Sequence, residues 1–72
     1  MTDAAMTEGE RRVRKSFNPN SNPDVEKVKA LSAALIDLIH EHPAAHTDPR
    51  LAAIAMTRYE EAAMWAVKLV TT

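Results

Sequence analysis

The residues of this chain with the clearest chemical use are an aromatic residue and an asparagine, Phe17 and Asn18, set among basic residues. The basic residues around this pair are Arg11, Arg12, Arg14, Lys15, Lys27 and Lys29. A phenyl ring can stack on a nucleobase, an amide can read a base edge, and cations can bind phosphate oxygens. The structural alternative is that the Phe17 ring fastens a loop to neighbouring helices, and both interpretations stay open at this point.

Charge is unevenly distributed along the sequence, although the formal net charge is only −1. Residues 1–10 carry three acidic residues and no basic one, whereas residues 11–29 carry six basic residues against two acidic ones. Such a local excess of positive charge is typical of an anion-binding surface. Proteins that bind duplex nucleic acid usually have a basic domain as a whole, so we expect no duplex partner.

A group of possible metal ligands occurs at His40, Glu41, His42 and His46. Side chains two positions apart on a helix diverge by about 200°, and no further acidic ligand is fixed nearby, so we expect no metal site. Glu60 and Glu61 diverge by about 100° on a helix, and Glu61 is better placed to pair with Arg58. Motifs for nucleophilic catalysis or phosphate binding are absent from the sequence, which favours a binding protein without cofactors over an enzyme.

The length of 72 residues leaves room for one domain, and so short a chain buries a small fraction of its surface. Because the sequence has no cysteine, a disulfide cannot add stability, and oligomerisation is the expected way to enlarge the core. No apolar run approaches the roughly 20 residues that span a bilayer, and the first ten residues do not resemble a signal peptide. We therefore expect a cytoplasmic homo-oligomer without a membrane partner.

The chain divides into a flexible tail at residues 1–10 and a helical domain at residues 11–72. The tail is small, polar and acidic and contains the only glycine, Gly9. Residues 11–17 are expected to form a short helix or arm. Two prolines and several turn-forming residues at 17–23 then predict a loop.

A first long helix is predicted to begin at Asn22, which is a suitable N-cap before Pro23 and Asp24. Its apolar stripe has helical spacing and consists of Val28, Leu31, Leu35, Leu38 and His42, flanked by Val25, Ile36 and Ile39. The opposite, polar face carries Glu26, Lys29, Asp37 and Glu41. Pro43 ends the helix.

A second long helix is predicted from the cap-and-proline pair Asp48-Pro49 to about Val70. Apolar residues occupy most of its circumference, at Leu51, Ala52, Ile54, Ala55, Met56, Tyr59, Ala62, Ala63, Trp65, Ala66, Leu69 and Val70. One partner helix cannot cover so wide a surface, and the surplus is expected to face other subunits. The predicted fold is all-α, an antiparallel helical hairpin with a short N-terminal helix or arm, assembled as an oligomeric helical bundle.

Two parts of the sequence resemble a known family. Residues 51–68 read LAAIAMTRYEEAAMWAVK, in which EEAAMWA is the most specific block, and Phe17-Asn18-Pro19 lies upstream. These stretches resemble the hairpin domain shared by the phage anti-CBASS type two protein and the Thoeris anti-defence type one protein. The resemblance implies a hexameric cytoplasmic sponge that binds cyclic di- and trinucleotides without cleaving them and so blocks CBASS effectors in the infected bacterial host.

The same resemblance implies which residues bind the cyclic dinucleotide. The family uses an aromatic residue followed by asparagine, and a lysine early in the first long helix, which match Phe17, Asn18 and either Lys27 or Lys29. The usual aromatic residue is tyrosine, so Phe17 keeps the stacking face but lacks the hydroxyl group.

A separate trinucleotide pocket is implied where subunits meet around a symmetry axis, with Met64 and Lys68 as candidates. An ordinary surface lysine is the alternative for Lys68. Two other functions remain open for the whole chain. One is a small helical interaction protein that docks on a partner helix bundle, and the other is weak nucleic-acid binding through residues 11–15.

Overall fold

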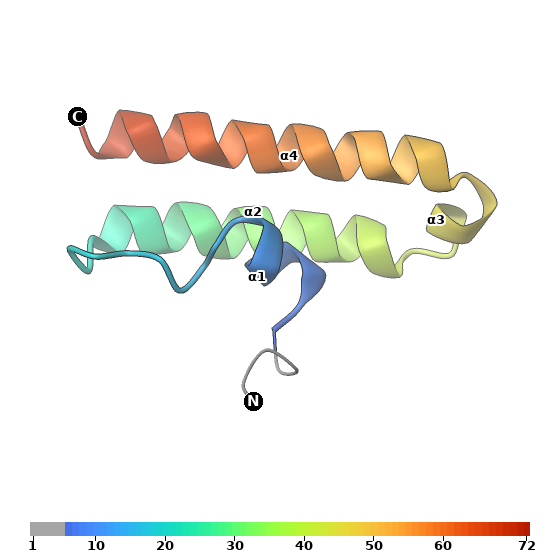
Figure 1. Cartoon of the computed structure of the whole chain (residues 1–72), viewed down its shortest axis with the longest axis horizontal. Coiled ribbons are helices and arrows are strands. Elements are labelled where there is room, and N and C mark those ends of the chain that lie inside the picture. Colours follow the sequence, from blue (N-terminus) through green and yellow to red (C-terminus); the bar gives the residue numbers. More distant parts are fainter. Residues whose placement is uncertain (1–5) are drawn as a thin grey trace.

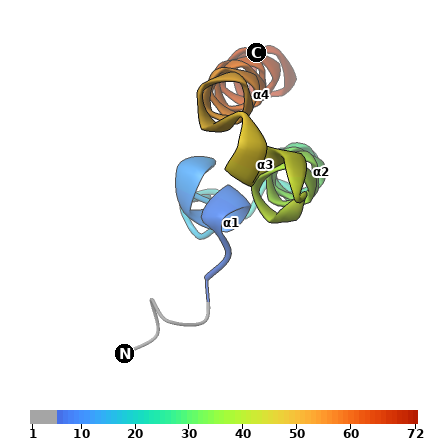
Figure 2. The same cartoon turned by 90° about the vertical axis from the view of Figure 1, so that its right-hand side faces the viewer.

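The computed structural model describes residues 6–72, and the helices of this range form an antiparallel hairpin with a short helix at its side. The helices are α1 (Glu8–Arg12), α2 (Pro23–Glu41), α3 (Ala44–Thr47) and α4 (Pro49–Val70). The long helices α2 and α4 lie side by side, and α3 joins them at one end (Figure 1). Viewed along the hairpin, α1 packs beside α2 (Figure 2). The all-helical hairpin expected from the sequence is therefore confirmed.

Both long helices begin at the residues that the sequence predicts. The Asn22 side chain accepts hydrogen bonds from the backbone N–H groups of Asp24 (2.8 Å) and Val25 (3.2 Å). The Asp48 side chain accepts one from the N–H of Leu51 at 3.1 Å. Each cap is followed by a proline at the first helical position, where a missing N–H has no cost.

The N-terminal helix begins earlier and ends sooner than the 11–17 segment expected from the sequence. A capping box starts α1: the Glu10 N–H donates to the Thr7 hydroxyl (3.0 Å), and the Thr7 N–H donates to the Glu10 carboxylate (3.1 Å). Residues 8–10 of the segment expected to be a tail are thus helical. Residues 1–5 of that segment lie outside the described residues.

Gly9 lets α1 approach α2 closely. It is buried, and a Cβ atom at this position would lie 2.1 Å from the backbone oxygen of Ala33. The Gly9 N–H donates to a carboxylate oxygen of Asp37 at 2.7 Å. Asp37 was expected on a solvent-facing surface, but this long-range bond draws it toward α1 and leaves it half-buried.

The buried face of α2 differs from the stripe that the sequence predicts. The buried residues are Val25, Lys29, Ala33 and Ile36, so the expectation of a solvent-facing Lys29 is wrong. Ala33 faces inward because α1 packs against its backbone at Gly9. Most of the predicted stripe is turned outward instead, and Leu31 and Leu38 are 69% and 64% exposed.

The buried residues of α4 are two alanines and one methionine, Ala52, Met56 and Ala63. The large apolar residues that stay exposed on it are Leu51, Ile54, Tyr59, Met64, Trp65 and Leu69. Single exposed apolar residues are normal on a protein surface, but six large ones on one helix are typical of an interaction surface. No helix within residues 6–72 is both long enough and apolar enough to cross a membrane.

We predict that Gly9→Ala strongly destabilises the fold. The added methyl group would overlap the Ala33 backbone, which cannot move like a side chain, and overpacking of this kind costs about 1–3 kcal/mol. Denaturant unfolding followed by circular dichroism measures the loss. Glu41→Ala, at an exposed position near the end of α2, is the control and should change stability by less than about 0.5 kcal/mol. Equal effects of the two substitutions would show that the close approach at Gly9 is unimportant.

Candidate functional site

The segment between α1 and α2 leaves α1 through a Schellman motif. The Lys15 N–H donates to the Glu10 carbonyl (3.0 Å), and the Arg14 N–H donates to the Arg11 carbonyl (3.3 Å). Arg14 occupies the position of this motif that is usually glycine, and its φ of 55° lies in the left-handed region. For a residue with a side chain this conformation costs about 1–2 kcal/mol.

Lys29 of α2 fixes the path of this segment. Its side-chain ammonium is buried and donates hydrogen bonds to the backbone carbonyls of Arg14 (2.9 Å) and Phe17. Burial, with a smaller contribution from the positive charge of Arg14, lowers the pKa of Lys29 below its usual value. Lys29 therefore acts as an anchor that holds the turn from Arg14 to Phe17 against α2.

The Phe17 ring projects from the anchored segment. It is 56% exposed, which argues against a ring whose main purpose is to fasten the loop to the helices. The guanidinium carbon of Arg14 lies 4.9 Å from the ring centroid, and the Lys29 nitrogen lies 5.4 Å from it. Both distances fall within the range of cation–π interactions, so the exposed ring is set among positive charges.

Asn18 closes the loop that leads into α2. Its side-chain amide donates to the Asn22 carbonyl (2.9 Å) and accepts from the Asn22 N–H (3.0 Å). The Ser21 N–H donates to the Asn18 carbonyl (3.0 Å), and Ser21 has a φ of 49°. One N–H and one lone pair of the Asn18 amide remain outside this pair of bonds.

The basic residues of this region have different environments. Arg11 pairs with Glu8, and Arg12 pairs with Glu8 (2.7 Å) and with Glu60 of α4 (3.2 Å). The hydrogen bond from Arg12 is the main reason why the pKa of Glu8 is lowered. Within residues 6–72, Arg14 has no carboxylate within ion-pair distance.

Two hollows are lined by Phe17. The first, of about 270 Å³, is lined from the N-terminal segment and α2 by Arg12, Val13, Arg14, Phe17 and Lys29, and from α4 by Glu60, Ala63, Met64 and Val67. The second, of about 300 Å³, is lined by Phe17, Asn18, Pro19, Asn20, Asn22, Val25, Lys29, Val67 and Thr71. We call these the arginine hollow and the asparagine hollow. Phe17, Lys29 and Val67 line both of them.

The other candidates from the sequence lie in different places. Lys27 is exposed on α2 and lines neither hollow. Met64 lines the arginine hollow, beside the expected dinucleotide residues. Lys68 lies beside Trp65, with its nitrogen 5.5 Å from the centroid of the Trp65 ring. Val67 was missed from the sequence. Its only signal was its helical spacing of three residues from Met64.

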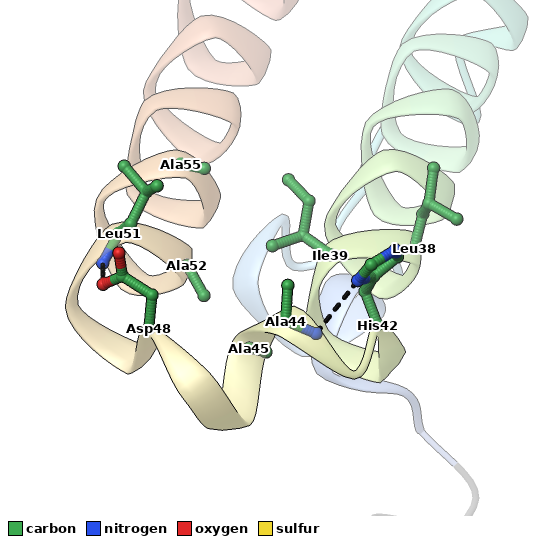
Figure 3. A pocket seen from close by; sticks show the side chains of 9 residues that line it. All are labelled: Leu38, Ile39, His42, Ala44, Ala45, Asp48, Leu51, Ala52 and Ala55. Carbon is green, nitrogen blue, oxygen red and sulfur yellow. Dashed lines mark hydrogen bonds between the residues drawn. The ribbon is translucent and has the colours of Figure 1, made fainter.

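A third hollow, of about 300 Å³, lies at the α3 end of the hairpin (Figure 3). Its lining is mostly apolar, and its two polar side chains are already engaged: His42 accepts from the Ala44 N–H (3.0 Å), and Asp48 caps α4. Among residues 6–72, no three His, Asp or Glu side chains are grouped so that they could hold a metal ion. The predicted Arg58–Glu61 pair is confirmed at 3.3 Å.

We predict that Lys29→Met destabilises the protein by about 1–3 kcal/mol at neutral pH. Methionine keeps much of the apolar stem but leaves the Phe17 carbonyl without its Lys29 donor and the Arg14 carbonyl with only the Phe17 N–H. Thermal and denaturant unfolding measure the loss. Lys27→Met removes a charge from an exposed position two residues away and is the matched control.

The difference in stability between the wild type and Lys29→Met should grow at alkaline pH. Because the pKa of Lys29 is lowered in the folded protein, the unfolded chain binds more protons than the folded chain between that lowered pKa and about 10.5. The wild type therefore gains stability relative to the variant as pH rises through this window. A neutral amine retains two N–H groups, enough for both carbonyls. A difference that shrinks in this window would show that the pKa of Lys29 is raised, not lowered, in the folded protein.

Comparison with known proteins bears directly on this geometry. Residues 8–71 match the model of the family described as Acb2/Tad1, hairpin domain. This range contains all the helices of the described residues and includes both hollows at Phe17. A search of the curated proteins and a search of the solved structures each gave no match. The match to the family model confirms the resemblance seen in residues 17–19 and 51–68, and the chain belongs to the Acb2/Tad1 hairpin-domain family.

Proposed function

We propose that this chain is a phage anti-defence sponge, which binds cyclic oligonucleotide messengers and holds them intact so that CBASS effectors are not activated. Membership of the Acb2/Tad1 hairpin-domain family supports this function. The proposed place of action is the cytoplasm of the infected bacterial host. Such a sponge needs affinity and abundance, and it needs no catalytic residues.

The observation that carries the proposal is the exposed Phe17 ring among cations. An exposed aromatic face suits a nucleobase, and stacking of one base is worth about 1–3 kcal/mol. The exposed Arg14 beside the ring suits the phosphodiester groups that every cyclic dinucleotide carries, whereas the Lys29 nitrogen is already bonded to two carbonyls. We propose Phe17, Asn18 and Lys29 as the dinucleotide site of this chain, with Lys29 acting through the loop that it anchors.

The size of the hollows supports binding between copies of the chain. Each hollow, at about 270 or 300 Å³, lies at the lower end of the roughly 300–1,000 Å³ typical of small-molecule sites. One chain would thus enclose only part of a cyclic dinucleotide, and a second copy would complete the site. The exposed apolar residues of α2 and α4 offer the surface for such an assembly, which we propose to be a hexamer.

Cyclic trinucleotides are proposed as a second class of ligand, with Met64 and Lys68 as candidate residues. Met64 and Lys68 are four residues apart on α4, so their exposed side chains lie on neighbouring turns of one helix face, which supports a shared site. A positive charge repeated by symmetry around an axis would suit the phosphates of a cyclic trinucleotide. Lys27 remains a candidate for a contact made across subunits.

Docking on a partner helix bundle is the alternative function, and the exposed Leu31 and Leu38 stripe favours it. Light scattering distinguishes the two functions by the mass of the free protein. A sponge that covers its apolar surface with copies of itself is an oligomer, whereas a chain whose apolar surface binds a different partner is a monomer without that partner. A monomer that binds no cyclic nucleotide would support the alternative.

We predict that titration calorimetry with cyclic di-AMP, cyclic di-GMP, cyclic GMP-AMP and cyclic tri-AMP detects saturable binding of at least one of them. Ligand recovered after heat denaturation of the complex should be chemically intact, because release without cleavage is what distinguishes a sponge from a hydrolase. Chromatography with mass detection checks this. Absence of binding at micromolar concentrations by a properly assembled protein would refute the proposal.

We predict that Phe17→Ala lowers dinucleotide affinity by about 5- to 150-fold, the factor that corresponds to the loss of one stacking contact. Assembly should not change, because the surface proposed for assembly is formed by the exposed apolar residues of α2 and α4. Phe17→Tyr is the matched control, since it keeps the ring and should bind at least as tightly as the wild type. Dissociation of the Phe17→Ala assembly would instead identify the ring as a structural contact.

A further inference from the structure

We infer that Arg14 is a ligand-binding residue, which contacts the phosphodiester groups of a nucleotide that lies on the Phe17 ring in the arginine hollow. The inference rests on the proposed function and assigns the anion contact to one side chain. It depends on three properties of Arg14: its backbone conformation, its lack of an acidic partner among residues 6–72 and its position beside Phe17.

The backbone conformation of Arg14 is unfavourable for a residue with a side chain. Its φ of 55° places it at the position of the Schellman motif that glycine fills most readily. Glycine there would keep both backbone hydrogen bonds of the motif, since neither involves the side chain. The backbone of this turn therefore gives no reason for a side chain at position 14, and a reason for arginine must lie in what its guanidinium contacts, within the chain the Phe17 ring.

The acidic partners of this region are taken by other residues. Glu8 pairs with Arg11 and Arg12, and Glu60 pairs with Arg12. Lys29 is a buried cation whose nitrogen already donates to two carbonyls. In the described part of the chain, residues 6–72, Arg14 is thus a cation beside Phe17 whose exposed guanidinium has no carboxylate partner.

The position of Arg14 completes the argument. Its guanidinium carbon lies 4.9 Å from the centre of the Phe17 ring, and both residues line the arginine hollow. A guanidinium is planar and offers parallel N–H donors that match two oxygens of one phosphate. A base on the exposed ring would bring its phosphodiester within reach of those donors, whichever base it is.

The test is Arg14→Gly, for which stability and affinity should change in opposite directions. Without ligand, the thermal midpoint should equal or exceed that of the wild type, because glycine relieves the left-handed strain. Affinity for each cyclic dinucleotide that the wild type binds should fall by about tenfold or more. The fall should be similar for cyclic di-AMP and cyclic di-GMP, because the contact is to phosphate, and affinity of the variant should depend less on KCl concentration.

Two further variants complete the test. Ser21→Gly relieves the other left-handed residue of the same segment without removing a charge, and it should bind like the wild type. Arg14→Gln keeps a side chain at this left-handed backbone position but removes the charge. It should bind as weakly as Arg14→Gly, and it tests the charge even if the glycine variant folds poorly.

The outcomes separate this inference from the proposed function. Wild-type affinity in Arg14→Gly and Arg14→Gln, together with lost affinity in Phe17→Ala, would overturn the role of Arg14 and leave the sponge intact. A loss confined to guanine-containing ligands would overturn the phosphate assignment, because it would show recognition of a base edge. If the wild type binds none of the dinucleotides, the proposed function itself fails.

Discussion

The bonding of the buried Lys29 ammonium to two backbone carbonyls is the interaction on which the candidate site of this molecule depends. A cation without a carboxylate is costly to bury unless its N–H groups are satisfied, and here two backbone carbonyls satisfy them. Those carbonyls belong to Arg14 and Phe17, so the chain between α1 and α2 must follow the path that brings both oxygens to one point. The exposed ring, the left-handed turn and the two hollows beside Phe17 all follow from that path.

The parts of the fold that local chemistry determines could be predicted from the sequence. Asn22 and Asp48 cap the long helices as expected, because a cap is formed by residues two or three positions apart. The inward face of α2 could not be predicted in the same way. It depends on Gly9, whose N–H bonds Asp37 twenty-eight positions away, and on Lys29, whose partners lie in a segment without regular structure. A periodic pattern of leucines shows that a helix is amphipathic, but it does not identify the partner that each face meets.

The candidate site was predictable in its composition and less so in its arrangement. The sequence grouped Phe17 with nearby cations, and the structure places Lys29 and Arg14 beside the ring. The sequence alone did not distinguish a cation that bonds backbone carbonyls, such as Lys29, from one that is exposed to solvent, such as Arg14, because that difference depends on burial. Val67 enters from α4, fifty positions after Phe17, and lines both hollows only because the hairpin folds back.

The two hydrogen bonds between Asn18 and Asn22 help to order this loop in the absence of a ligand. Lys29 holds the start of the loop at Phe17, and these two bonds hold the loop where it enters α2 at Asn22. The residues between Phe17 and Asn22 are therefore ordered in the free protein. The conformational entropy of the loop is lost once, during folding, and is not lost again on association. A ligand bound at the proposed site on Phe17 would therefore keep more of its contact energy as affinity than it would on a loop that becomes ordered only on binding.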